Sequence, residues 1–331
     1  MRIKNNVSKT VLTIVCLLLL TIFSGCITEQ QNIKPSTHTR LNLFFFKGVW
    51  ASPGMEENVL EHDTEKMKVD GVNIFAIPVM YDVRQDGSIK IVLNAKWEGN
   101  EKNGYINMIR KAHDAGLAVF LEMDPVYLEN GEVVPVPKKI KEIFMENLKT
   151  ACLQWAEIAE QEGIEAFSPF NEPTTVIGVE DAIKWSEGIL PLIRQRFNSS
   201  VIIKFAGEGP GEEISQYGSI EGYDYVAVDI YAINDDQDSF MEYLNLVIAN
   251  ASSYVENYNL KGFIFGEMGI DSKNEKFQAE LFQRFFEETW NITSGYFICG
   301  WGQHNPEDPF TDVSFTDKPA ENIIKQWYTT G

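Results

Sequence analysis

From Leu41 onward, short apolar runs rich in aromatic and β-branched residues alternate with longer segments of helical periodicity. The apolar runs are nearly continuous instead of strictly alternating, which is typical of parallel strands covered on both faces. We therefore expect a series of parallel strands, each followed by a helix. The eight expected strands are residues 43–50, 72–79, 117–124, 165–171, 201–207, 225–232, 262–269 and 295–302.

The helical pattern is clearest after the third strand, where Ile140, Phe144, Leu148 and Trp155 keep to one face. Comparable amphipathic segments follow most of the other strands, and glycines that end a helix in the left-handed region come after several of them. The other expected helices are residues 56–69, 104–115, 179–197, 238–258, 274–290 and 319–328, with a short helix near residues 212–217.

Eight strand and helix units joined by right-handed crossovers predict an α/β fold, a single closed (β/α)8 barrel over residues 41–329. A doubly wound open sheet is the alternative. The chain has no GxGxxG after its first strand and no GxxxxGK[ST], which disfavours the nucleotide-binding version of that alternative.

In such a barrel, catalytic groups lie at the carboxyl ends of the strands and on the loops that follow. These positions are unusually rich in carboxylates and aromatic rings, whereas an ordinary barrel rim would be mixed polar. The residues at the expected strand ends are Trp50, Tyr81, Asp124, Asn171, Glu172, Glu208, Tyr231, Glu267 and Trp301.

Two of these carboxylates, Glu172 and Glu267, follow the fourth and seventh strands and should face each other across the barrel mouth. Two carboxyl groups about 5 to 5.5 Å apart can cleave a glycosidic bond with retention of configuration, one attacking the anomeric carbon and the other protonating the leaving oxygen. Because Glu172 follows Phe167 and Phe170 and faces a second carboxylate, we expect its pKa to be raised.

The segments "FNEP" at the end of the fourth strand and "GEMG" at the end of the seventh resemble the clan A glycoside hydrolases, a superfamily of retaining barrel enzymes. The resemblance implies that Glu172 is the general acid/base, that Asn171 contacts a sugar 2-hydroxyl and that Glu267 is the nucleophile. It also implies that Tyr231 holds the nucleophile and that Trp301 forms a floor for the sugar.

The remaining strand-end residues, Trp50, Tyr81, Asp124 and Glu208, are predicted to contribute sugar subsites. The expected activity is that of a retaining O-glycosyl hydrolase on β-linked oligo- or polysaccharides, with no metal or organic cofactor. The sugar, the linkage and the choice between endo and exo action stay open.

Other readings of the same residues are a noncatalytic cell-surface carbohydrate-binding barrel and a barrel lyase or aldolase. A pure binder has no need of a carboxylate pair, and an aldolase would use a Schiff-base lysine, for which Lys204 is the nearest candidate. The four histidines make no HxH or HExxH pattern, and no GxSxG occurs, so a metal site and a serine hydrolase are disfavoured.

The first residues differ from the rest of the chain. Basic residues precede an apolar run at 11–23 that is short for a membrane span, and "FSGC" ending at Cys26 resembles a bacterial or archaeal lipoprotein box. We expect a signal peptide over residues 1–25, lipid attachment at Cys26 and a polar tether over residues 26–40. A plain signal peptide and an uncleaved anchor are the alternatives. We expect the barrel to lie outside the cytoplasm, tethered at the cell surface or, with a plain signal peptide, secreted.

The formal net charge of −20 excludes a nucleic-acid partner, because phosphate binding needs a basic face and no segment has a Lys/Arg cluster. The acidic balance favours solubility at a cell surface or in a salty medium. Of the four cysteines, only Cys152 and Cys299 lie in the barrel, and their apolar surroundings predict buried thiols without a disulfide. The sequence does not indicate an oligomeric state.

Overall fold

The computed structural model describes residues 38–52, 54–207, 209–211, 217–233, 235–302 and 313–330. The predicted signal peptide, Cys26 and most of the predicted tether lie outside the described residues. Within the described ranges, no helix combines the length and the apolar character that crossing a membrane requires.

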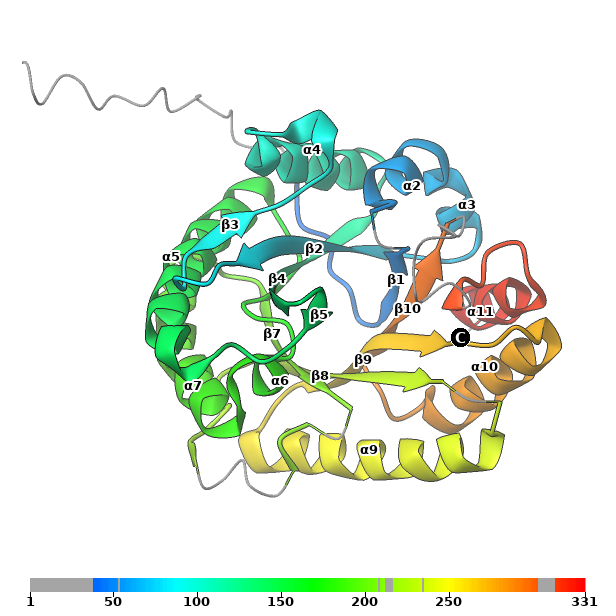
Figure 1. The fold of residues 1–331 in the computed structure, drawn as a ribbon. Coiled ribbons are helices and arrows are strands. Elements are labelled where there is room, and N and C mark those ends of the chain that lie inside the picture. The colour runs from blue at the N-terminus through cyan, green and yellow to red at the C-terminus, as the bar shows by residue number, and fades with distance from the viewer. Residues whose placement is uncertain are drawn as a thin grey trace, which may run out of the picture. The chain divides into compact units, whose positions relative to one another are not determined.

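Eight parallel strands form a closed barrel, as Figure 1 shows from the end at which the strands terminate. The ring closes because β1 pairs with both β2 and β10, and because β2 also pairs with β4. This closure confirms the predicted barrel and rules out the open sheet. The barrel strands are β1 (Phe46–Ala51), β2 (Ile74–Val83), β4 (Ala118–Glu129), β6 (Ala166–Ser168), β7 (Ser200–Ala206), β8 (Tyr225–Ala232), β9 (Gly262–Ile270) and β10 (Gly295–Trp301).

Helices surround the barrel and lie close to the predicted segments (Figure 1). The segment expected as one helix at 56–69 is two helices, because the turn that ends at Asp63 interrupts it. The short helix expected near 212–217 lies almost entirely outside the described residues. The helices are α2 (Glu56–His62), α3 (Thr64–Val69), α4 (Glu101–Asp114), α5 (Lys138–Glu162), α6 (Pro173–Ile177), α7 (Val179–Arg194), α9 (Gln237–Tyr258), α10 (Glu275–Thr289) and α11 (Pro319–Thr330), with a 3-10 turn η1 (Ala95–Trp97).

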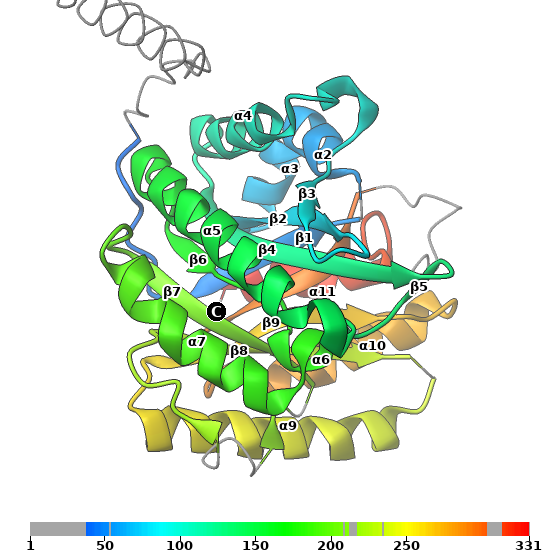
Figure 2. The ribbon, with the colours of Figure 1, turned by 60° about the vertical axis from the view of Figure 1, so that its left-hand side comes forward.

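Strands β2 and β4 run well past the other strands at the mouth of the barrel (Figure 2). They stay paired from Ile74 and Ala118 out to Val83 and Tyr127. Each then turns back in a hairpin, β2 with β3 (Ile89–Ile91) and β4 with β5 (Glu132–Val133). The two extensions raise one wall of the mouth, which the sequence pattern did not predict because it ended both strands near the barrel rim.

The apolar core has two layers. Alternate residues of each strand point either into the barrel or toward the helices, and the interior set packs around Phe120 and Phe297, whose ring centroids are 4.8 Å apart. Phe297 fits because Gly48 faces it: a Cβ at Gly48 would lie 2.3 Å from the Phe297 ring. The outer layer between strands and helices is larger and includes Phe265, Phe285 and many other aromatic rings. Burial of each such side chain contributes about 1.5–3 kcal/mol.

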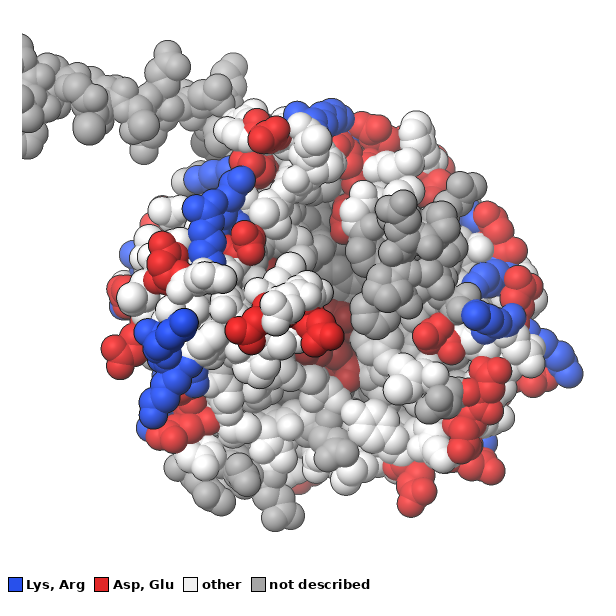
Figure 3. Space-filling view, viewed as in Figure 1, with Lys and Arg blue, Asp and Glu red and all other residues white. Residues whose placement is uncertain are grey.

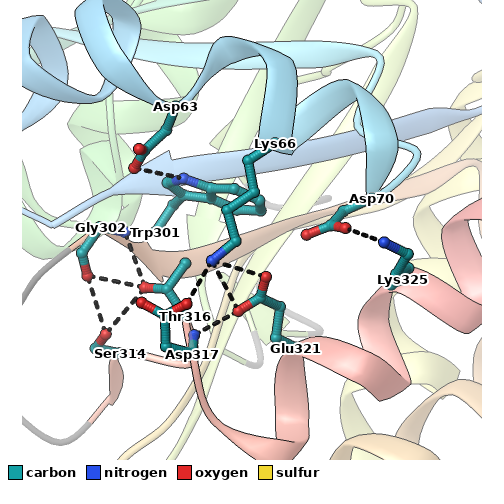
Figure 4. A network of polar contacts seen from close by, with 10 residues as sticks. All are labelled: Asp63, Lys66, Asp70, Trp301, Gly302, Ser314, Thr316, Asp317, Glu321 and Lys325. Atoms are coloured by element: carbon teal, nitrogen blue, oxygen red, sulfur yellow. Dashed lines mark hydrogen bonds and ion pairs between the residues drawn. The ribbon is translucent and has the colours of Figure 1, made fainter.

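The last helix, α11, is joined to α3 by a polar network, drawn in Figure 4. Lys66 Nζ lies 2.8 Å from Asp317 Oδ1 and 2.9 Å from Glu321 Oε1. Lys325 Nζ lies 2.8 Å from Asp70 Oδ1. These pairs are partly exposed, so each contributes at most about 1 kcal/mol, and their main effect is to align α11 with α3 where the barrel closes.

The two barrel cysteines are free thiols, as predicted. Cys152 lies on α5 in the outer core layer, whereas Cys299 lies on β10 in the interior layer.

Candidate active site

A cavity of about 560 Å³ opens at the carboxyl ends of the barrel strands. Figure 3 shows a hollow at the centre of this face with acidic side chains in it. Six of the nine residues predicted from the strand ends line the cavity, and they come from five different strands or the loops after them. These six are Trp50, Asp124, Asn171, Glu172, Tyr231 and Glu267.

Glu267 enters this cavity because β9 contains a bulge at Gly266. Val228 of β8 pairs with Phe265, and the next residue, Asp229, already pairs with Glu267, so Gly266 is the extra residue on β9. Phe265 packs in the outer layer, so strict alternation would turn Glu267, two residues later, outward as well. The bulge turns Glu267 toward the interior instead. Only glycine fits at the bulge, because a Cβ there would lie 2.7 Å from Asp229 Oδ1.

The Glu267 carboxylate is held by two donors. Tyr231 donates its hydroxyl to Glu267 Oε2 at 2.5 Å, and Lys204 Nζ donates to Oε1 at 2.5 Å. Both donors lie on neighbouring strands, β8 and β7, so the barrel itself fixes the carboxylate. The hydrogen bond from Tyr231 is the one predicted from the sequence, whereas the contact with Lys204 was not foreseen.

Glu172 occupies the loop immediately after the short strand β6 and is the residue before α6. Its backbone is left-handed, with φ 43° and ψ 54°, which is costly for a residue with a side chain. Pro173 explains part of this geometry, because proline suits the first position of a helix but keeps the preceding residue out of the right-handed helical region. The strained backbone therefore orients Glu172 as the helix begins.

Burial and the nearby Glu267 charge raise the pKa of Glu172, as predicted. Lys204 and the neighbouring Asp229 act in the opposite direction, and Asp124 adds a smaller upward contribution. The upward effects dominate, so Glu172 retains its proton to a higher pH than an ordinary glutamate.

Asn171 and Asp124 form a polar pair on the same wall. Asn171 donates Nδ2 to Asp124 Oδ1 at 3.2 Å, and its backbone N–H bonds to the Met123 carbonyl at 2.8 Å. The amide oxygen Oδ1 of Asn171 is buried and has no hydrogen-bond partner among the described residues. An acceptor left open at a cavity wall suits a ligand hydroxyl. Burial raises the pKa of Asp124, and the bond from Asn171 opposes this rise.

Trp50 forms the opposite part of the wall and also closes the β9 bulge. Its indole Nε1 donates to the Gly266 carbonyl at 2.7 Å, which satisfies a backbone acceptor that the bulge leaves out of the sheet. Its ring lies over Lys204, with Nζ 4.9 Å from the centroid. Trp50 thus contacts both the bulge and the buried cation.

Three charged residues in or next to the cavity wall were missed as site residues: Glu122 on β4, Lys204 on β7 and Asp229 on β8. Lys204 is fully buried, and its Nζ lies 3.0 Å from Glu122 Oε1 and 3.2 Å from Asp229 Oδ2. A usable signal was present, because β7 and β8 are apolar except for one charged residue each and Glu122 lies within an apolar run of β4, and a buried charge requires a partner.

The interior network has strongly shifted pKa values. Burial alone would lower the pKa of Lys204, but the surrounding carboxylates Asp229, Glu122 and Glu267 raise it well above the usual value. Burial raises the pKa of Glu122 to about 8, although Lys204 opposes the rise. Burial also raises the pKa of Asp229 well above its usual value. Lys204 is therefore a firmly held ammonium group, and Glu122 and Asp229 keep their protons to a higher pH than ordinary carboxyl groups do.

Two of the predicted site residues, Tyr81 and Trp301, do not line the cavity. Tyr81 lies within β2, not after it, and faces the outer layer, where its hydroxyl accepts a hydrogen bond from Trp155 Nε1 at 2.9 Å. The residues of β2 that line the cavity are Pro78 and Met80, which have the opposite parity along the strand. Glu208, the third predicted residue that is absent from the cavity lining, lies outside the described residues.

Trp301 is also turned away, because β10 contains its own bulge. Trp50 pairs with Cys299 and Ala51 pairs with Trp301, so Gly300 is the extra residue and takes a φ of 97°. Trp301 is 0% exposed and points outward, and its Nε1 lies 3.3 Å from Asp63 Oδ2 on the helix side (Figure 4). The prediction that Trp301 forms a floor for a sugar is corrected accordingly.

One cluster of metal-ligating side chains occurs among the described residues, and it lies at the start of β6, not at the cavity: His38, His113 and Glu165. Glu165 is saturated by donors, with backbone bonds from Leu41 N at 3.0 Å and Val119 N at 2.8 Å in addition to the two imidazoles. The imidazole rings are stacked with centroids 3.6 Å apart, so their in-plane lone pairs run side by side instead of converging on one ion. The cluster fastens the segment before β1 to the barrel.

No protein-family profile and no curated protein sequence matches this chain. Solved structures match over most of its length. A GH113 β-1,4-mannanase is 17% identical with a TM-score of 0.64, covering 87% of this chain and 100% of the mannanase chain. The GH113 β-mannanase AaManA from Alicyclobacillus acidocaldarius, solved in complex with ManMIm, is 15% identical with a TM-score of 0.62, covering 87% of this chain and 98% of its own.

A GH5 xyloglucan-specific endo-β-1,4-glucanase from a metagenomic library, solved in complex with cellotriose, is 12% identical with a TM-score of 0.59. That match covers 86% of this chain and 96% of the glucanase chain. At these identities the likeness shows the fold, a (β/α)8 barrel of the kind found in these glycoside hydrolases.

Proposed function

We propose that this barrel is a retaining glycoside hydrolase that cleaves β-linked glycans, with Glu172 as general acid/base and Glu267 as nucleophile. One observation carries the proposal: two carboxyl groups on the same cavity lie in opposite electrostatic environments. Glu267 receives hydrogen bonds from a phenol and an ammonium group, while burial raises the pKa of Glu172. Carboxyl groups with divergent environments are what acid and nucleophile roles require. The likeness to GH113 and GH5 enzymes supports the same assignment at the level of the fold.

In the first step, a Glu267 oxygen attacks the anomeric carbon while the bond to the leaving oxygen breaks and Glu172 protonates that oxygen. The two donors hold the Glu267 carboxylate in position before the sugar binds. In the second step, Glu172 takes a proton from water as the water oxygen attacks the anomeric carbon and releases Glu267. The amide oxygen of Asn171, which has no partner among the described residues, can accept a hydrogen bond from a sugar hydroxyl.

A second hollow of about 640 Å³ supports a substrate that extends beyond one sugar. It adjoins the first cavity, since Glu172 and Tyr231 line both, and its other walls include Asp229, Phe240 and Tyr243. Glu172 therefore lies at the boundary, where a general acid would protonate a glycosidic oxygen joining two sugar units. We propose an oligo- or polysaccharide as the substrate.

The acidic cavity lining favours uncharged sugars as substrates. The cavity lining contains the carboxyl groups of Glu56, Glu122, Asp124, Glu172 and Glu267 but no lysine or arginine among its described residues. The internal segments outside the described ranges, at 53, 208, 212–216, 234 and 303–312, contain no lysine or arginine in their sequences either. A uronic acid would thus meet carboxylates without a free cation, and we expect aryl β-glucuronides to be poor substrates.

The aldolase alternative is disfavoured by the state of Lys204. A Schiff-base lysine must be a neutral amine that meets a substrate carbonyl, whereas Lys204 is a buried ammonium group held by three carboxyl groups.

The test is a screen of aryl β-glycosides and β-glycans with the wild type, Glu172→Ala and Glu267→Ala. We expect turnover by the wild type and a loss on the order of 10⁴-fold for Glu267→Ala. Azide should restore turnover of activated aryl glycosides by Glu172→Ala, because the anion attacks without a general base. Equal activity of Glu267→Ala and wild type would refute the nucleophile assignment. Binding of β-glycans without turnover would support the noncatalytic barrel.

We also propose that the barrel is tethered to the outer face of a membrane through lipid on Cys26. The support is the sequence alone: a basic start, an apolar run and "FSGC". Mass spectrometry of the mature protein should find a lipid-modified amino terminus at Cys26. An unmodified terminus, or an intact residue 1–25 segment, would refute the lipid anchor.

A further inference from the structure

Lys204 contacts the proposed nucleophile, Glu267, and also Asp229, which shares a cavity wall with the proposed acid/base, Glu172. Its Nζ contacts Glu267 Oε1 at 2.5 Å on one side and Asp229 Oδ2 at 3.2 Å on the other. Asp229 in turn shares the wall of the second hollow with Glu172 and influences the protonation of Glu172. Apart from its ion pair with Lys204, neither carboxyl oxygen of Asp229 has a hydrogen-bond partner among the described residues.

Every charged or titratable group that faces Lys204 can be named. Glu122 comes from β4, Asp229 from β8 and Glu267 from β9, and β1 contributes only the Trp50 ring. Farther out, Asp124, Glu172, Tyr231 and Cys299 surround the same carboxylates. Lys204 is the only cation in this described set, and its burial fixes its position.

We propose that Lys204 is the counter-charge for both half-reactions: it pairs directly with Glu267 in the free enzyme and, through Asp229, with Glu172 in the glycosyl-enzyme. This inference rests on the proposed function. Lys204 and Asp229 are positioning residues, since each acts on the substrate only through Glu267 or Glu172.

The charges balance without any additional proton. In the proposed scheme for the free enzyme, Glu267 is the carboxylate, Lys204 is the ammonium group, and Glu172, Asp229 and Glu122 are the protonated acids. When Glu267 forms an ester and Glu172 gives its proton to the leaving oxygen, the single negative charge moves from Glu267 to Glu172. Asp229 can share its proton with the Glu172 carboxylate while facing Lys204, so the ammonium group stabilises that charge as well. Attack by water returns a proton to Glu172 and restores the Glu267 carboxylate.

The two residues should affect different steps. Lys204→Met removes the cation beside Glu267, so the carboxylate form becomes less favourable and the acidic limb of the kcat/KM profile should move up by about one pH unit or more. Asp229→Asn keeps a polar group of the same shape that has no proton to share as an acid. It should slow hydrolysis of the glycosyl-enzyme roughly tenfold or more while changing glycosylation less.

The experiment measures pH profiles and pre-steady-state bursts with a dinitrophenyl β-glycoside that the wild type hydrolyses, and detects the glycosyl-enzyme by intact mass. Lys47→Met is the matched control, because Lys47 also lies on a barrel strand but binds the Tyr328 carbonyl away from the cavity. Should Lys204→Met fold poorly, Lys204→Met with Glu122→Gln removes the cation together with one acid and should show the same shift. Lys204→Arg should restore much of the wild-type profile.

The proposal would be overturned if the acidic limb of the kcat/KM profile were unshifted both in Lys204→Met and in Lys204→Met with Glu122→Gln. Equal slowing of both steps by Asp229→Asn would also overturn it. Either result would leave the glycosidase assignment intact. Absence of turnover by the wild type on every glycoside would instead refute the proposed function. The pairing of Lys204 with Glu267 can be tested without turnover by carbon-13 NMR of labelled glutamate carboxyl groups, with Glu267→Gln assigning the signal. We expect that signal to titrate at higher pH in Lys204→Met than in wild type, and an identical titration would overturn the pairing.

Discussion

The ends of β9 and β10 lie side by side in the barrel and carry the same irregularity with opposite results. Each strand has one extra residue, a glycine, near its carboxyl end. At Gly266 the bulge brings Glu267 into the cavity, where two donors hold it. At Gly300 the bulge turns Trp301 out to the helices, where Asp63 accepts its N–H. A shift of one residue in strand register is enough to decide whether a side chain points into the cavity or into the core.

The two ends also differ in what surrounds them. Glu267 faces an interior of carboxyl groups and one ammonium group, whose positions depend on four strands. Trp301 faces an apolar layer that includes Phe315, with ring centroids 5.7 Å apart, and its indole N–H bonds to Asp63. Changes at the first end should therefore alter activity and its pH dependence, and changes at the second should alter stability alone.

The largest effect is expected from Trp301→Ala. Removing a fully buried indole from the outer layer should lower the free energy of unfolding by about 3–5 kcal/mol. Urea denaturation measures this loss, and kcat/KM per folded molecule should stay near that of the wild type. Trp301→Phe keeps most of the volume and should lose far less stability. A large loss of substrate affinity in folded Trp301→Phe would show that Trp301 reaches the sugar after all.

At the other end, Gly266→Ala should lower kcat/KM roughly 100-fold, because a displaced carboxylate costs about that factor. The added Cβ would lie 2.7 Å from Asp229 Oδ1 and 3.1 Å from Lys204 Cε, so the bulge and Glu267 must shift. Steady-state kinetics on an aryl β-glycoside measures the loss. Gly188→Ala on α7 is the control, since its Cβ would meet nothing within 4 Å. Wild-type activity in Gly266→Ala would mean that the bulge does not set the position of Glu267.

A smaller loss is expected from Tyr231→Phe, which removes one of the two donors on Glu267. A hydrogen bond to a charged group contributes about 1.5–3 kcal/mol, so kcat/KM should fall roughly 10- to 100-fold. Tyr223→Phe removes a buried hydroxyl of the same kind, bonded to the Ser186 carbonyl away from the cavity. That control should lose stability but keep its kcat/KM. Equal kinetic losses in the two variants would remove Tyr231 from the proposed site.

The smallest effect concerns the pH dependence of stability. The pKa of Glu122 is raised from 4.5 to about 8, chiefly by burial, so the folded state binds this proton more tightly than the unfolded chain does. Glu122 therefore makes the free energy of unfolding fall as pH rises from about 4.5 to about 8. Glu122→Gln has no proton to lose, and its free energy of unfolding should fall less over that range than that of the wild type. Urea melts at several pH values measure the slope.

Trp301→Phe is the comparison for this slope, because it alters the outer layer and no interior acid. It should keep the wild-type pH dependence. If Glu122→Gln keeps it too, Glu122 does not carry a proton near neutral pH.

The fold was predictable because its evidence is local. Eight apolar runs of strand length, each followed by an amphipathic segment, predicted a closed barrel, and the strands lie within a few residues of the predicted positions. Glu172 and Glu267 were found for the same reason, since each directly follows or ends an apolar run. The extensions of β2 and β4 past the rim escaped prediction because they pair with each other and with the hairpin strands β3 and β5, not with the rest of the barrel.

The site was only partly predictable, because its composition depends on which side chains point inward. Alternation along a strand shows which residues share a face of the sheet. It would have excluded Tyr81 from the cavity, because Tyr81 lies on the same face as the outer residues Phe75, Ile77 and Val79. Alternation cannot reveal that one added residue at Gly266 or Gly300 reverses the facing, because a bulge exists only in relation to the neighbouring strand.

The sequence by itself determined that this chain forms a (β/α)8 barrel with two carboxyl groups near its mouth, since strand and helix periods follow from the side chains of each segment. Only the tertiary structure decided that Lys204 lies among Glu122, Asp229 and Glu267. Those four residues come from four strands, and a buried charge finds its partners only when the ring has closed and the register of the strands is set.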